Sequence, residues 1–65
     1  MKYITINDVA AKTHYSLPTL YRYVSKRRIP FIKLGHRLLF QESEIENWID
    51  SHKVPMRNSL LKKLN

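Results

Sequence analysis

The sequence predicts a small α+β domain that is mainly α-helical, and three features support this expectation. Apolar residues recur at helical spacing up to Pro30, two β-rich runs then flank the single glycine, Gly35, and a second helical stripe follows Phe40. A chain of 65 residues has room for one domain, which buries about 60% of the surface of its unfolded form. We therefore expect one folded domain over residues 1–52 and a basic amphipathic tail over residues 53–65.

The first helix is expected over residues 6–13. Thr5 and Asp8 have the spacing of a capping box, although aspartate is a weaker partner there than glutamate. Val9 and Thr13 continue the helical spacing, and residues 14–15 then make a turn. A small residue at position 10, an alanine, would let another helix cross closely.

The second helix is expected over residues 17–26. Ser16 can cap its start, and Pro18 falls in the first turn, where a missing N–H costs nothing. Leu20 and Val24 form the inward pair. Two short helices joined by a tight turn make a helix-turn-helix unit.

After Pro30 the pattern predicts a two-stranded hairpin, or wing, around the pair at 35–36. Gly35 suits this turn because only glycine takes a positive φ without strain. The side chains near the tip of the wing are Lys33, His36 and Arg37.

A third helix follows, with an apolar stripe at Ile45, Trp48 and Ile49. Ser43 is a possible cap, unless residues 41–42 already form the first turn. Trp48 is the largest core candidate, a reading that we prefer to a stacking role. We expect this helix to end at residues 54–55, a Val-Pro pair.

The tail has apolar residues on one face of a possible short C-terminal helix, namely Met56, Leu60, Leu61 and Leu64. Ten residues are too few for a stable isolated helix. The tail is therefore expected to dock on the core, to bind a partner or to fray.

Charge gives the clearest indication of function. Twelve Lys and Arg against five Asp and Glu give a net charge of +7, and no acidic residue lies between Val9 and Gln41. Four of the five acids fall in one later segment, residues 42–50. Such asymmetry predicts a polyanionic partner on one face, the alternative being a basic surface that only aids solubility.

Other classes of protein are disfavoured. The chain has no cysteine, and His14, His36 and His52 have the spacing of no metal motif, so neither a metal nor another cofactor is expected. No nucleophile–base pair or glycine-rich phosphate loop indicates an enzyme. Because no apolar run has the length of a signal peptide or a membrane span, we expect no membrane association and a cytoplasmic location.

The ordered set of motifs resembles the excisionase-type winged helix-turn-helix family, small relatives of the MerR-like DNA-binding domains. The resemblance rests on Tyr3-Ile4-Thr5, Val9-Ala10, Tyr15-Ser16, Thr19-Leu20-Tyr21-Arg22, Ile29-Pro30, Lys33-Leu34-Gly35-His36-Arg37 and Ile45-Glu46-Asn47-Trp48-Ile49. It covers about residues 3–50 and implies a phage or mobile-element protein that binds DNA and is associated with the nucleoid of a bacterial cell. The chain departs from the family at Leu17 and Pro18, where polar or basic residues are frequent, and at Arg27, where glycine is frequent.

On the family pattern, the DNA-binding residues of the recognition helix are Ser16, Thr19, Tyr21, Arg22 and Lys26. Those of the wing and the phosphate contacts are Arg27, Arg28, Lys33, His36 and Arg37. Each has a plainer alternative: Ser16 as a cap only, Thr19 as a helix-start residue, Tyr21 packed on the first helix or the wing, and the cations as solvated surface. Tyr23 is expected in the core rather than on DNA.

The function expected from the resemblance is that of an excisionase, which binds and bends attachment-site DNA to promote excision by an integrase. The expected partners are double-stranded DNA, a tyrosine or serine recombinase, and further copies of the chain bound cooperatively. A small prophage or plasmid transcription regulator is the alternative. A protein-interaction module with an acidic partner is a third hypothesis, of a different class.

Overall fold

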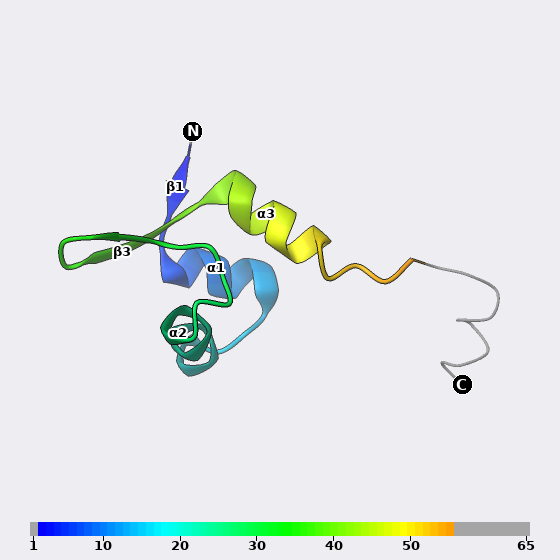
Figure 1. The fold of residues 1–65 in the computed structure, drawn as a ribbon, viewed down its shortest axis with the longest axis horizontal. Coiled ribbons are helices and arrows are strands. Elements are labelled where there is room, and N and C mark those ends of the chain that lie inside the picture. The colour runs from blue at the N-terminus through cyan, green and yellow to red at the C-terminus, as the bar shows by residue number, and fades with distance from the viewer. Residues whose placement is uncertain (1, 56–65) are drawn as a thin grey trace.

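The computed structural model describes residues 2–55 of the chain. In chain order its elements are β1 (Tyr3–Ile4), α1 (Ile6–Thr13), α2 (Leu17–Ser25), β2 (Ile32–Leu34), β3 (Arg37–Gln41) and α3 (Glu42–Asp50). Figure 1 shows the β2–β3 hairpin projecting to one side of the body and α3 running toward the opposite side, with α2 below them. The expected fold class, a mainly helical winged helix-turn-helix, is confirmed.

The sheet holds one strand more than the expected two-stranded wing, because the N-terminal residues pair with β3. Its order is β1-β3-β2, and both pairings are antiparallel, with Ile4 opposite Phe40. Since side chains alternate between the faces of a strand, Ile4 and Phe40 share the core face and Tyr3 lies on the outer face, where it is 54% exposed. A strand of two residues has too short a pattern to be recognised in the sequence.

A capping box starts α1 as expected. Thr5 Oγ1 accepts a hydrogen bond from the Asp8 N–H at 3.4 Å, and the Asp8 carboxylate accepts one from the Thr5 N–H at 3.0 Å. The bond from the Thr5 N–H holds the pKa of Asp8 below its ordinary value. The helix ends at Thr13, and His14 then takes a left-handed conformation, φ 63°, that starts the turn toward α2.

The core lies between the sheet and the three helices. Its buried members among the described residues are Ile4, Ile6, Val9, Leu20, Ile29, Phe40 and Ile45. Phe40 is the largest fully buried side chain. Trp48, the largest core candidate in the sequence, packs against this core but is only partly buried. Its indole N–H reaches the Arg28 carbonyl oxygen at 2.9 Å.

The bounds of α3 differ from the expected ones at its C-terminal end. Gln41 takes the N-cap position without a capping bond from its side chain, and Ser43 lies inside the helix. The helix ends at Asp50, before a C-cap at Ser51, and does not continue to residues 54–55. The tail residues Met56, Leu60, Leu61 and Leu64 lie outside the described residues, so their role stays a prediction.

Candidate nucleic-acid interface

The start of α2 carries a connected row of polar side chains. Ser16 caps the helix as expected, since its Oγ accepts from the Thr19 N–H at 3.4 Å. The Ser16 hydroxyl also lies 3.0 Å from Thr19 Oγ1, and Arg22 Nη2 lies 3.5 Å from the same oxygen. Residues three apart share one side of a helix, so these groups form a row that runs from the N-terminus along α2.

The exposed and buried faces of α2 separate clearly. Leu20 is fully buried, and Val24 and Tyr23 are half-buried against the core, as expected. Leu17 and Tyr21 are 37% and 53% exposed on the rest of the surface. The side of α2 that does not pack therefore presents apolar and aromatic groups beside the polar row, and the degree of exposure of Tyr21 gives no support to tight packing against α1 or the wing.

The C-terminal end of α2 is closed by a Schellman motif. Lys26 is the C-cap, the Arg27 N–H donates to the Val24 oxygen at 3.0 Å, and the Arg28 N–H donates to the Tyr23 oxygen at 2.9 Å. Arg27 takes a left-handed φ of 55°, at a position that glycine usually occupies. The helix is thus one residue shorter than expected, and its three terminal cations are all exposed.

Trp48 fixes this end of α2 relative to α3 and to the wing. Besides the hydrogen bond from its indole to Arg28, its ring meets Tyr23 edge to face at a centroid distance of 6.0 Å. Ile29 follows directly and is buried, 3% exposed. The segment that joins α2 to the hairpin is therefore anchored at two successive residues, Arg28 through its carbonyl oxygen and Ile29 through its buried side chain.

The wing is a tight hairpin with a two-residue turn. Leu34 pairs with Arg37, and Gly35 between them has φ 61°. The positive φ falls on the first turn residue and not on His36, a pattern typical of a type II′ turn. Lys33, His36 and Arg37 are all exposed at the tip, where the sequence placed them.

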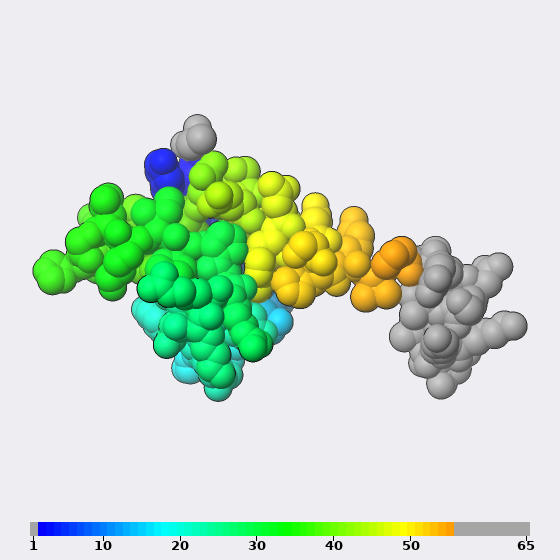
Figure 2. Space-filling view, viewed as in Figure 1, coloured from blue at the N-terminus to red at the C-terminus, as the bar shows by residue number. Residues whose placement is uncertain are grey.

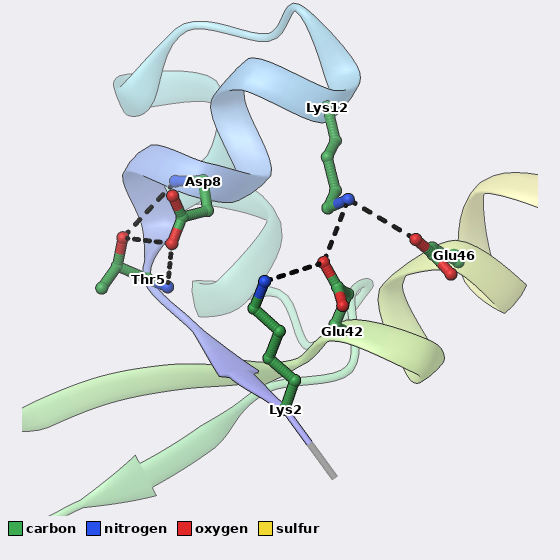
Figure 3. A network of polar contacts seen from close by, with 6 residues as sticks. All are labelled: Lys2, Thr5, Asp8, Lys12, Glu42 and Glu46. Carbon is green, nitrogen blue, oxygen red and sulfur yellow. Dashed lines mark hydrogen bonds and ion pairs between the residues drawn. The ribbon is translucent and has the colours of Figure 1, made fainter.

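The acidic side chains that form ion pairs lie away from α2 and the wing tip. Lys12 Nζ lies 3.3 Å from Glu42 and 3.5 Å from Glu46, and Lys2 Nζ lies 4.0 Å from Glu42 (Figure 3). The Glu42 carboxylate raises the pKa of Lys12 above its ordinary value. Within residues 2–55, ion pairs involve no cation other than these two lysines. The basic side chains between positions 22 and 37 thus have no acidic partner within residues 2–55 and can pair with an external anion.

The basic segments adjoin one another on the surface. Figure 2 shows the teal-to-green residues of α2 and the segment after it beside the brighter green hairpin, on one face of the molecule. The acid-bearing helix α3 extends away from the hairpin in the same view. The structure therefore brings the sequence-predicted residues of α2 and of the wing onto neighbouring elements.

One surface feature was missed by sequence reasoning. Leu34, next to the turn glycine, is 62% exposed, although its aliphatic side chain was counted only as a strand residue. The signal that could have found it is its place at a strand end beside Gly35, where no second sheet or helix can cover it.

The described part of the chain gives no sign of metal or membrane chemistry. No group of three or more His, Asp or Glu side chains within residues 2–55 is placed to hold a metal ion. His14 follows α1, His36 is in the turn of the wing, and His52 packs its ring on Trp48 at a centroid distance of 4.9 Å. No helix among these residues has the length and apolar character needed to cross a bilayer.

Comparison with known proteins agrees with this geometry. The model of a family described as "Helix-turn-helix domain" matches residues 3–53, which span all six elements. The chain belongs to this helix-turn-helix family, and membership supports a DNA-binding function. No curated protein and no solved structure matches the chain.

Proposed function

We propose that the protein binds duplex DNA sequence-specifically, with α2 in the major groove and the wing against the neighbouring minor groove. The observation that carries the proposal is the set of exposed cations on α2, its C-terminal segment and the hairpin, none of which is paired within residues 2–55. A helix fits the major groove, and the residues near its N-terminus reach the base edges.

The polar row supplies the contacts within the groove. Arg22 can donate two parallel hydrogen bonds to a guanine or a phosphate. Its guanidinium is oriented by a hydrogen bond to Thr19 Oγ1. Ser16 and the Leu17 N–H can bind an anion at the positive end of the helix, since Pro18 has no N–H and the Thr19 N–H donates to Ser16. Leu17 and Pro18 replace polar readers with apolar surface, which suits the methyl groups of thymines.

The remaining cations set the strength of binding. Lys26, Arg27 and Arg28 bind phosphates at the end of α2, Lys33 and Arg37 do so at the wing, and His36 can donate a hydrogen bond there. With about five phosphates neutralised, the logarithm of the affinity falls with the logarithm of the salt concentration at a slope of roughly −4 to −5.

We further propose that this binding serves site-specific excision. The support is the resemblance of the ordered motifs to excisionases, together with a compact winged unit suited to binding at adjacent sites. The protein would act in a bacterial cytoplasm, binding cooperatively and bending attachment-site DNA for a recombinase. In this proposal the apolar residues of the tail, Met56, Leu60, Leu61 and Leu64, contact the integrase or a neighbouring protomer.

Selection of duplexes from a random pool tests the DNA proposal. The wild type should enrich a defined motif, and the double variant Arg22→Ala/Arg37→Ala should bind the selected duplex at least tenfold more weakly, with a shallower salt slope. Lys53→Ala is the control: it also removes a basic side chain, but one beyond the end of α3, and should bind nearly as the wild type does. Wild type that binds no duplex at low salt, or a double variant that binds unchanged, contradicts the proposal and favours a protein-interaction module.

Excision and transcription are separated by a second experiment. Deletion of the gene should abolish excision of the element that carries it, and the purified protein should bend that element's end sequences. Unaffected excision, with changed expression from one promoter, favours the transcription regulator instead.

A further inference from the structure

Leu34 is an apolar side chain in an unusual place. It is 62% exposed, more than any other large apolar residue from β1 to α3, because it lies near the tip of a hairpin that projects from the body. Water contact of this kind is unfavourable by about 25 cal/mol for each Å² of apolar surface. Nothing in the core uses the side chain, since it is not among the residues packed there.

The strand register shows what surrounds Leu34. It lies directly opposite Arg37, on the same face of the hairpin as the next pair but one, Ile32 and Leu39. That face is the outer one, because the alternate residues Leu38 and Phe40 turn toward the core. The aliphatic group therefore stands beside a guanidinium at the end of a thin two-stranded projection.

The tip is also narrow. The loop has two residues, and a Cβ built on Gly35 would meet no atom within 4 Å. A minor groove is only about 6 Å wide. A two-residue turn with no side chain at Gly35 can therefore enter where a longer loop cannot.

The basic side chains near the tip indicate which class of molecule binds it. Arg37 lies opposite Leu34, Lys33 precedes it in the chain, and no acidic residue occurs between Val9 and Gln41. The basic side chains would not strengthen binding to an apolar protein groove. A nucleic acid can bind both features, the basic groups through its phosphates and the leucine through its bases. Architectural DNA-binding proteins combine the two features, with cations on the phosphates and an apolar wedge between base steps.

We propose that Leu34 is a wedge that inserts from the minor groove at a base step and bends the duplex. The proposal rests on the DNA binding inferred above and deepens it, because it names the residue that converts binding into bending. The target is a flexible pyrimidine–purine step in an A·T-rich stretch, where unstacking costs least and no guanine amino group blocks the groove.

Bend angles measured by energy transfer across the selected duplex test the wedge. Leu34→Ala should lower the bend by about 20° or more and the affinity by roughly three- to tenfold. Its salt slope should equal that of the wild type, since an uncharged side chain displaces no counterion, whereas Arg37→Gln should flatten the slope by about 0.9. Tyr3→Ala removes an exposed apolar group from the outer face at the far end of the sheet, and should change neither bend nor affinity.

The possible results distinguish the Leu34 wedge from the DNA binding on which it rests. Wild type that binds no duplex overturns both. Wild type that binds, with Leu34→Ala and Leu34→Thr that bend DNA as the wild type does, overturns the wedge alone; the threonine variant keeps the strand preference and guards against misfolding. Variants that lose self-association without DNA, yet bind and bend DNA unchanged, also overturn it and assign Leu34 to a protein contact.

Discussion

Replacing Arg27 with glycine should stabilise the domain, although it removes a charged side chain. Arg27 occupies the first position after the C-cap of α2, with φ 55°, and its N–H and that of Arg28 close the Schellman motif. A side chain with a Cβ is strained in this conformation, because the Cβ approaches the following carbonyl oxygen. Glycine adopts it freely, so Arg27→Gly keeps both hydrogen bonds and removes the strain.

The size of the effect follows from two opposing terms. Left-handed backbone costs a residue with a Cβ about 1–2 kcal/mol. Glycine at the same place makes the unfolded chain more flexible, which costs about 0.4–1 kcal/mol. The net gain in the free energy of unfolding is about 0.5–1 kcal/mol, or roughly 2–8 °C in Tm for a domain of this size.

Thermal and urea unfolding of three variants measure this gain. Arg27→Ala loses the same charge but keeps the Cβ, so the difference between glycine and alanine at position 27 isolates the backbone. Arg28→Gly places glycine at the neighbouring residue, which has no positive φ, and should destabilise. Equal stability of Arg27→Gly and Arg27→Ala would refute the reasoning.

Three further changes have defined expectations. Gly35→Ala should cost about 1 kcal/mol in urea unfolding, with Gly35→Asn milder; the site is open, so the cost comes from the positive φ, and a cost near zero would contradict this. Trp48→Phe should cost about 1–2 kcal/mol, because the Arg28 carbonyl loses its partner, and DNA binding at low temperature should weaken as the anchor between α2 and the wing loosens. The lowered pKa of Asp8 stabilises the fold above its ordinary value of 3.8, and this contribution is lost as the pH falls through the folded-state pKa; Asp8→Asn should therefore flatten the pH dependence of the urea midpoint below about pH 4, and an unchanged acid profile would argue against the capping box.

Local signals in the sequence were sufficient for most of the fold. The capping residues Thr5 and Ser16 placed the starts of both helices of the helix-turn-helix, and Gly35 placed the turn of the hairpin. Charge asymmetry along the chain predicted that one face meets a polyanion, and this stays a prediction. The capping and turn signals work because each depends on residues within four positions of one another.

The features that sequence missed depend on contacts between distant segments. Strand β1 exists only because Tyr3 and Ile4 pair with a strand 36 or more residues later, opposite Gln41 and Phe40. Trp48 stays at the edge of the core because its N–H finds a carbonyl 20 positions away. The exposure of Leu34 likewise follows from the register of the hairpin and from how far it projects.

Affinity cleavage tests most directly the claim that α2 and the wing act as one DNA-binding surface. The chain has no cysteine, so Lys26→Cys on α2 and His36→Cys on the wing each give a single site for an iron–EDTA label. We expect cleavage by the two labelled proteins in a major groove and the adjacent minor groove, within about half a helical turn on one side of the selected duplex. Cleavage from only one of the two positions, or from both at unrelated places along the duplex, would contradict it.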